Sequence, residues 1–402
     1  MPFILLVTAA FILFPVIMIP INFLLMNAVN GKAKYYFLFL FAMGVGMFGI
    51  HFMPDGPYDI VRYIYNLETL RLISNPLVLL NSEAVKSYGY TIGLDTNVLF
   101  NIYSWIISKF QNDSLFSFFS MVISYVTFLF PVISTKNNFV IKIFTALLVV
   151  TSIPLVITIS AVRWPIAAGL FISLQYIYFA KLNSRKYIWI FLIPVLFHSS
   201  MIIVVAPSFL IAFFDIRTVK VAMLSVVGMM ALFPLVLFYA QKSTIPYVTK
   251  LLQKFTDYSA TPLGKGFWLD NGALVVSIVW VVFFFYVLYK MEIGTIYRKK
   301  HYILVVMISL LTYVGLYMFN RPLTPRFNWI IPMLALAGFN VVSGEKLKIG
   351  LFGWVLITTG FLSILANNYT QFLQGFLSQA IRLQNPDVWT DTFIKAIAGY
   401  GG

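Results

Sequence analysis

Long apolar runs recur along almost the whole chain, and they decide what it can fold into. The stretch 302–319, YILVVMISLLTYVGLYMF, carries no charged residue. A run of about 20 apolar residues crosses the hydrocarbon core of a bilayer as a helix. The chain is 60% hydrophobic and 10% charged, whereas about 25% of the residues in a soluble domain are charged. The sequence therefore predicts an all-α polytopic integral membrane protein.

We expect one transmembrane domain over residues 1–402, with about twelve helical membrane segments. The segment Tyr187 to Phe214 is interrupted by Pro194, by His198 and by Pro207, so we expect two short helices that meet near His198. The other expected spans are 3–28, 35–53, 115–133, 143–160, the first arm of a hairpin from Ser160, 220–240, 272–290, 302–319, 327–342 and 349–366.

Three stretches between or after these spans are expected outside the membrane. They are the outer loops of about 54–114 and 241–271 and the tail of about 367–402, which is amphipathic and predicted to lie along the membrane. Within the first loop, 98–110 is apolar but short, which favours an interfacial or re-entrant segment over a span.

The basic residues predict the orientation. The loops 29–34, 134–142, 181–186, 214–220, 290–301 and 343–348 hold 15 of the 28 lysines and arginines. The positive-inside rule places these loops in the cytoplasm and both termini outside. The net charge of +15 is therefore interpreted as topology, and a nucleic-acid partner is not expected because no binding motif accompanies the charge.

The residues and motifs that several common kinds of catalysis need are missing from the sequence. The chain has no cysteine and three histidines, which excludes thiolate chemistry and makes a histidine-rich metal centre a poor hypothesis. The sequence contains no phosphate-binding P-loop, no HExxH and no GxSxG. Asp-rich magnesium clusters are missing too. We therefore expect a metal-independent reaction without a cofactor.

The central hairpin, Ser160 to Pro207, carries the first two candidates. Arg163 and His198 lie on either side of a basic cluster at Lys181, Arg185 and Lys186. If that cluster marks the cytoplasmic turn, Arg163 and His198 return together to the outer side. His198 could act as a general base near neutral pH, or it could be a buried histidine hydrogen-bonded to the helix break.

More candidates lie in the first outer loop, in PDGPYDIVRYIYNLE. Asp55, Asp59, Arg62 and Tyr63 all belong to it. Asp59 and Arg62 are three residues apart, so a local ion pair on one helix face is the simpler interpretation. The alternative is that Asp59 positions an acceptor sugar or supports the base. The tyrosines suit a membrane interface and sugar stacking equally well.

The late corner NRPLTPRFNW adds Arg321 and Arg326. A guanidinium matches phosphate oxygens and stays charged in apolar surroundings. Together with Arg163, these arginines could hold a lipid diphosphate at the outer surface and stabilise the charge that grows on it as it leaves. The alternative for each is that it reaches to lipid headgroups or caps a helix beside proline.

These motifs resemble a known family, the bacterial polysaccharide polymerases, which comprise O-antigen polymerase (Wzy) and EpsG-like proteins. The resemblance rests on Asp59-x-x-x-Tyr63, on AVRWPIAAGLF, on FHSSMI one hairpin later, and on the late arginine corner. The order and spacing of the motifs agree over most of the chain. The sequence departs from the pattern at Trp164-Pro165, where the family leads us to expect a polar residue such as Gln.

The resemblance implies a membrane-embedded glycosyltransferase with a GT-C-like fold in the bacterial inner membrane, with its active site facing the periplasm. It would join undecaprenyl-diphosphate-linked oligosaccharide repeat units into O-antigen or a related surface polysaccharide of lipopolysaccharide biosynthesis. Arg163 and Arg326 would bind the donor diphosphate with help from Arg321. His198 would activate the acceptor hydroxyl, with Asp59 as its competitor. Membrane lipid and a chain-length regulator protein are the other expected partners.

Two other functions stay open from the sequence. A lipid-linked oligosaccharide flippase should carry charge throughout the depth of a central cavity, whereas the spans here are nearly free of charge at mid-depth. An O-antigen ligase, or another outer-face transferase, would share most of the features above.

Overall fold

The computed structural model describes residues 2–51, 59–80, 97–153, 155–182, 184–225, 227–228, 242, 267–291, 297–319, 321, 324, 327–345, 349–375 and 391–398. Every element in this part of the chain is a helix. Six of the described helices are long and apolar enough to cross a membrane. The predicted helical membrane class is therefore confirmed, but the predicted number of about twelve segments is not.

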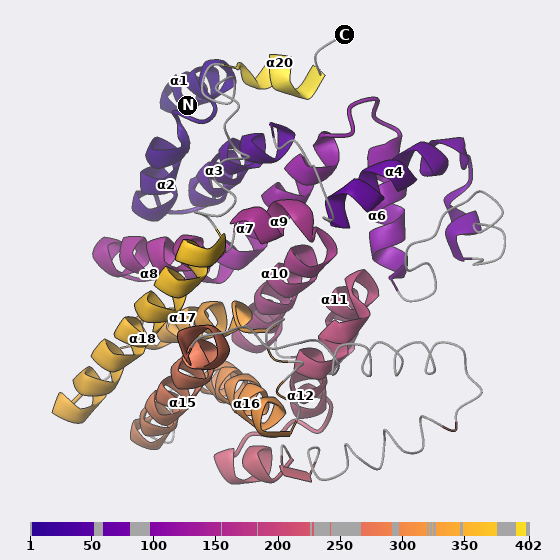
Figure 1. The fold of residues 1–402 in the computed structure, drawn as a ribbon. Coiled ribbons are helices and arrows are strands. Elements are labelled where there is room, and N and C mark those ends of the chain that lie inside the picture. The colour runs from indigo at the N-terminus through magenta and orange to yellow at the C-terminus, as the bar shows by residue number, and fades with distance from the viewer. Residues whose placement is uncertain are drawn as a thin grey trace.

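Figure 1 shows how these helices are arranged. The N-terminal half contains α1 Pro2–Leu13, α2 Ile19–Ala28, α3 Ala33–Ile50, α4 Asp59–Leu72, η1 Pro76–Leu80, α6 Val98–Ser108, α7 Leu115–Ser134, α8 Phe139–Ser152, α9 Leu155–Ser160 and α10 Arg163–Tyr176. The C-terminal half contains η2 Ile177–Leu182, η3 Arg185–Phe191, α11 Leu192–Phe197, η4 Ser199–Met201, α12 Ile202–Phe213, α15 Phe267–Lys290, α16 Tyr297–Phe319, α17 Ile330–Ser343, α18 Leu351–Gly375 and α20 Phe393–Ala398.

The expected first span, 3–28, is wrong as a single helix. The chain forms α1, a turn over 14–18, and then α2. Proline explains the break, because the residue before a proline is pushed out of the helical region and Phe14 precedes Pro15. Pro20 then lies in the first turn of α2, where its missing N–H leaves no hydrogen bond unmade. The expected span 143–160 is likewise divided, between α8 and α9.

Two glycines bring the central helices close together. A Cβ added at Gly49 of α3 would lie 3.0 Å from the backbone of Ser117 on α7. One added at Gly169 of α10 would lie 2.1 Å from the Thr127 hydroxyl, also on α7. Small residues allow membrane helices to pack at short distances. Because of these contacts, α7 lies between α3 and α10 and ties the hairpin to the N-terminal helices.

The second arm of the hairpin matches its prediction. Helix α11 ends at Phe197, His198 has extended backbone with φ −149° and ψ 111°, and the chain resumes as η4 and α12. The two short helices therefore meet at His198 as expected. A distant side chain satisfies one freed backbone group, since the Ser199 N–H donates to Asn97 Oδ1, just before α6, at 3.1 Å.

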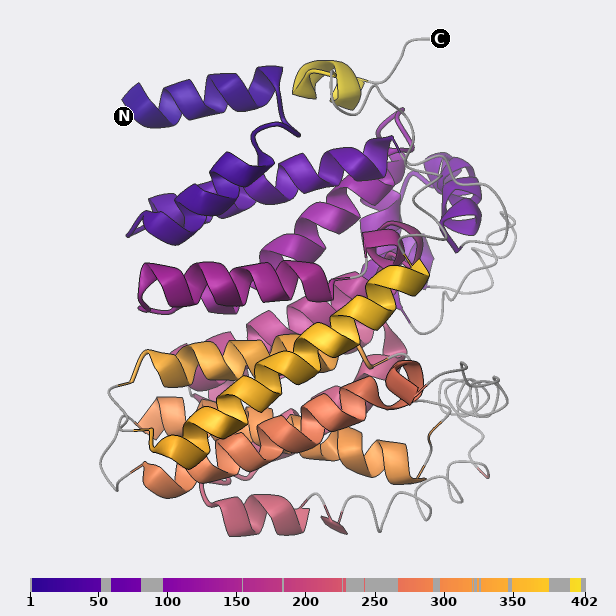
Figure 2. The ribbon, with the colours of Figure 1, turned by 60° about the vertical axis from the view of Figure 1, so that its left-hand side comes forward.

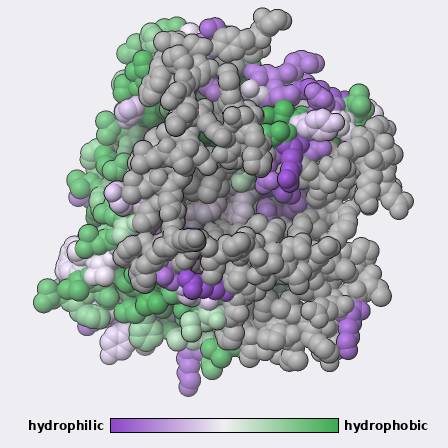
Figure 3. Space-filling view, in the orientation of Figure 1, coloured by the Kyte–Doolittle hydropathy of each residue, from purple (hydrophilic) through white to green (hydrophobic). Residues whose placement is uncertain are grey.

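Helix α6 has 11 residues, about 16 Å of helix, so it is too short to cross the hydrocarbon core. It packs with α4, and Figure 2 shows both helices at one end of the long helices. Figure 3 shows hydrophilic residues gathered over this region and hydrophobic residues covering the opposite side of the view. Most of the expected span 220–240 and of the outer loop 241–271 falls outside the described residues.

The tail differs from its prediction. Helix α18 continues to Gly375, so the predicted start of the tail near 367 lies inside a helix. The later segment α20 packs against α1 and α3, with the Phe393 ring 5.4 Å from that of Phe11. The buried carboxylate of Asp391 lies 3.6 Å from His51 Nε2 at the end of α3, and this contact joins the residues before α20 to α3.

Candidate functional site

Arg163 is the first residue of α10, and it joins three helices. Its Nε donates a hydrogen bond to the Tyr63 hydroxyl of α4 at 2.6 Å. Its guanidinium carbon lies 5.3 Å from the centre of the Tyr63 ring and 5.5 Å from that of Phe100 on α6. Within the described residues no carboxylate pairs with Arg163. In the part of the chain that the structure describes, aromatic rings and one hydroxyl surround the guanidinium.

The position of Arg163 in its helix is electrostatically unfavourable. A helix N-terminus carries a partial positive charge, which disfavours a cation by about 0.3–1 kcal/mol. No acidic residue lies in the first turn of α10. Pro165 in that turn helps to start the helix there, because it needs no hydrogen-bond partner for its nitrogen. A guanidinium added to the positive end of a helix is an arrangement that an anion would stabilise.

His198 lies at the helix break and is 8% exposed. Its Nδ1 and the Ser200 hydroxyl are 2.7 Å apart, and the tautomer of the ring decides which of them donates. This contact and the Ser199–Asn97 bond fix the ring in place. The second interpretation of His198, a buried histidine bound to its own helix break, therefore describes its contacts, and the role of general base stays a prediction.

Trp164 connects Arg163 to His198. Its ring centre lies 6.1 Å from that of His198, 5.5 Å from that of Phe327 and 5.0 Å from that of Trp329. The structure thus brings the two ends of the hairpin together, as predicted, and adds the end of the late corner to them. We call Tyr63, Phe100, Arg163, Trp164, His198, Phe327 and Trp329 the Arg163 cluster.

The remaining residues of the first outer loop lie apart from this cluster or outside the described residues. Asp59 begins α4, and its carboxylate lies 3.9 Å from Arg62 with both side chains at least half exposed. The expected local ion pair is therefore present. Tyr63, for which a membrane interface and sugar stacking were both open, is instead part of the Arg163 cluster, where it is 4% exposed and its hydroxyl accepts from Arg163. Asp55 lies outside the described residues.

The late corner is described in part. The guanidinium carbon of Arg321 lies 5.3 Å from the Tyr317 ring centre. The Thr324 hydroxyl donates to the Arg321 carbonyl at 2.7 Å. Arg326 falls outside the described residues, so its predicted contact with a diphosphate stays a prediction.

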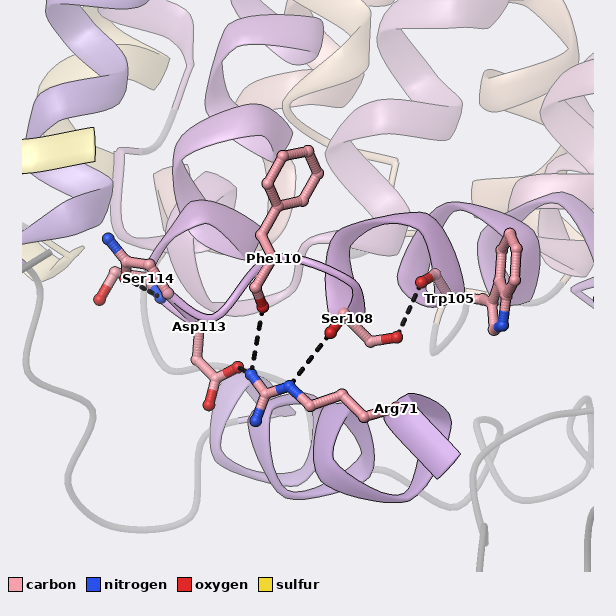
Figure 4. A network of polar contacts seen from close by, with 7 residues as sticks. Arg71, Trp105, Ser108, Phe110, Asp113 and Ser114 are labelled. Atoms are coloured by element: carbon pink, nitrogen blue, oxygen red, sulfur yellow. Dashed lines mark hydrogen bonds and ion pairs between the residues drawn. The ribbon is translucent and has the colours of Figure 1, made fainter. Parts of the chain in front are cut away.

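A set of polar contacts that the sequence does not indicate fixes α4 against α6 and the residues between α6 and α7. Figure 4 shows Arg71 donating to the Ser108 carbonyl at 3.1 Å and pairing with Asp113. Lys109 donates to the Ile73 carbonyl at 2.7 Å and to two more carbonyls at the end of α4. Trp105 Nε1 donates to the same Ile73 carbonyl at 2.8 Å. Cations at a helix C-terminus are favourable, so these contacts stabilise the C-terminal end of α4.

These polar contacts matter for the Arg163 cluster because Tyr63 lies on α4. Burial raises the pKa of the Asp113 carboxyl above its ordinary value, and the charge and hydrogen bond of Arg71 oppose that shift. Without Arg71, the carboxyl would be half-buried without its cation. The pair therefore holds the end of α4 in place, about two turns from Tyr63.

The described residues contain no group of three or more His, Asp or Glu side chains that could hold a metal ion. The chemistry available at the Arg163 cluster is therefore that of a cation at a helix N-terminus, an imidazole whose Nδ1 contacts a serine, and a set of aromatic rings. This set can bind an anion and, through His198, exchange a proton with a bound hydroxyl.

Comparison with known proteins identifies no family for the chain. No family model matches the sequence, and no curated protein and no solved structure matches it. The resemblance to polysaccharide polymerases therefore rests on the motifs quoted above, and the function is a proposal.

Proposed function

We propose that this protein is a membrane-embedded glycosyltransferase that joins undecaprenyl-diphosphate-linked oligosaccharide units at the periplasmic face of the inner membrane. One observation carries the proposal. Arg163 lies at the N-terminus of α10 with Tyr63 as its hydrogen-bond partner and no carboxylate partner among the described residues, and Trp164 links it to His198. An anionic leaving group and a hydroxyl that must lose a proton are the two substrates that such a pair suits.

In the proposed reaction, the growing chain is linked through the anomeric carbon to undecaprenyl diphosphate. A hydroxyl of the incoming unit attacks that carbon and gives its proton to His198. The bond between the carbon and the diphosphate oxygen breaks, and the electron pair leaves with the diphosphate. Arg163, assisted by Arg321 and Arg326, stabilises the charge on the departing oxygens. A glycosidic bond forms, and undecaprenyl diphosphate is released with the proton held by His198.

Two features support the acceptor side of this assignment. His198 contacts Ser200 through Nδ1, an arrangement that orients an imidazole for proton transfer at its other nitrogen. Asp59, the competing base, is half exposed and paired with Arg62. The described geometry therefore favours His198 over Asp59 as the base.

The test is the length distribution of surface polysaccharide in the host bacterium, separated on a gel, with and without this protein. A ladder that collapses to a single repeat unit in its absence supports a polymerase. Loss of the single-repeat band as well would point to the flippase or the ligase and would overturn the proposal. Among variants, His198→Ala should give the collapsed pattern and Asp59→Ala should retain the ladder. Normal polymer from both variants would show that neither His198 nor Asp59 is the base.

A further inference from the structure

Trp164 carries a buried hydrogen-bond donor that the proposed reaction has not used. The side chain is 7% exposed, and no acceptor lies within hydrogen-bonding distance of its Nε1 among the described residues. A buried donor without a partner costs about 1–3 kcal/mol. Most buried indole N–H groups find a partner, so this one calls for an explanation.

The neighbours of Trp164 indicate what kind of acceptor would suit it. The residue directly follows Arg163 at the N-terminus of α10, and its ring lies against His198. An indole N–H and a guanidinium only donate, and the helix end is positive. All three features favour an oxygen that accepts and carries negative charge. A phosphate oxygen has both properties.

The directions of the two donors indicate how many phosphate groups the ligand has. Successive residues of an α-helix diverge by about 100° around its axis, so the side chains of Arg163 and Trp164 leave the helix in different directions. A single phosphate bound by one of them is poorly placed to satisfy the other. A diphosphate has two phosphate groups on one bridge and can offer an oxygen to each.

From this we infer that Trp164 is a substrate-binding residue whose indole N–H recognises the second phosphate of a lipid diphosphate held by Arg163. The inference rests on the proposed function and deepens it, because it names the headgroup that the site distinguishes. A lipid with one phosphate, such as undecaprenyl phosphate or a phospholipid, would engage Arg163 and leave the indole donor unpaired.

The experiment measures lipid binding to the full-length protein in nanodiscs by native mass spectrometry. The three probes are undecaprenyl diphosphate, undecaprenyl phosphate and phosphatidylglycerol. The variant is Trp164→Phe, which keeps a ring and removes the N–H. We expect its affinity for the diphosphate to fall about tenfold, with a change below about twofold for the two single-phosphate lipids.

The chain offers a matched control in Trp280 of α15. It is also buried, its Nε1 also lacks an acceptor among the described residues, and the rings around it are phenylalanines. Trp280→Phe should leave all three affinities unchanged. This control separates loss of a ligand contact from the general effect of replacing a buried tryptophan.

The outcomes distinguish this inference from the proposed function. If Trp164→Phe binds diphosphate as the parent protein does while Arg163→Ala does not, the role of Trp164 is wrong and the function stands. Equal losses for all three probes would mean that the site recognises any phosphate headgroup, which also overturns the inference. If the parent protein does not prefer undecaprenyl diphosphate to phosphatidylglycerol, the proposed function itself fails.

Discussion

Trp164 and Trp280 are both buried, and neither indole nitrogen has an acceptor in the described part of the chain, yet their surroundings differ. Trp280 packs with Phe283, Phe284, Phe339 and Phe361, with ring centres 5.3–5.8 Å from its own. We call these five residues the Trp280 cluster.

The Arg163 cluster uses the same aromatic packing but includes a cation and an imidazole. The comparison separates two uses of aromatic residues in one bundle. In the Trp280 cluster the rings fill space between α15, α17 and α18. In the Arg163 cluster the rings surround a guanidinium and an imidazole. Substitutions in the first should change stability, and substitutions in the second should change activity.

The largest effect is expected from Arg163→Ala. Loss of the guanidinium removes the group proposed to stabilise the leaving diphosphate, and polymer formation should fall by at least about a hundredfold. The measurement is polymer yield from lipid-linked units with purified protein in vesicles. Arg217→Ala is the control, because that exposed arginine pairs with Asp215 beyond the end of α12. Unchanged yield from Arg163→Ala would remove the distinction between the two clusters.

Gly360→Ala tests the Trp280 cluster. An added Cβ would lie 2.8 Å from the Trp280 ring, and overpacking of this kind costs about 1–3 kcal/mol. The midpoint of thermal unfolding in detergent should fall, while polymer yield per folded molecule stays constant. Gly350→Ala is the milder control, since the nearest atom there would be 3.6 Å away. A loss of yield at equal folding would show that the Trp280 cluster also takes part in function.

Arg71→Gln examines the polar contacts that support the Arg163 cluster. Asp113 would lose its cation and the Ser108 carbonyl would lose a donor, at a cost of about 2 kcal/mol. We expect a lower thermal midpoint and a partial loss of yield, because α4 positions Tyr63. Asp113→Asn in the same background should restore part of the stability, since it removes the uncompensated charge. No recovery in that double variant would contradict the explanation.

The smallest change is expected from Tyr63→Phe. The ring contacts with Arg163 and Phe100 remain, and only the hydroxyl that accepts from Arg163 Nε is lost. Yield should fall about threefold with little change in the thermal midpoint, because the hydrogen bond orients a group that acts on substrate. Tyr125→Phe, another buried tyrosine, is the control. A falling midpoint with unchanged yield would assign Tyr63 to folding alone.

The sequence predicts the parts of this structure that depend on local chemistry. The break at His198 follows from Pro194 and the HSS motif, and the approach of the start of α10, through Trp164, to His198 follows from a hairpin with a basic turn. Pro15 indicates the break within the expected span 3–28, but the long apolar run favours a single span there.

Other parts depend on contacts between distant segments. Arg71 and Lys109 bind backbone carbonyls about 40 positions away in the sequence. Because every residue has a backbone carbonyl, the residue types do not indicate which carbonyl will accept. Tyr63 is a second example. The sequence is compatible with an interfacial Tyr63 or with one that stacks on a sugar. Its hydrogen bond with Arg163 depends on the packing of α4 on α6, which the sequence does not show. The unpaired N–H of Trp164 likewise becomes visible only when its neighbours are known.

The close contact between Gly169 and Thr127 has a mechanical consequence. The contact holds the middle of α10 against α7, and Arg163 lies six residues away at the N-terminal end of the helix, a distance of about 9 Å. A tilt of α10 by about 10° around this contact would move Arg163 by about 1.5 Å. Misplacement by about 1 Å can slow a reaction a hundredfold. The alignment of the guanidinium thus depends on a helix contact in the bundle that leaves no room for a methyl group at Gly169.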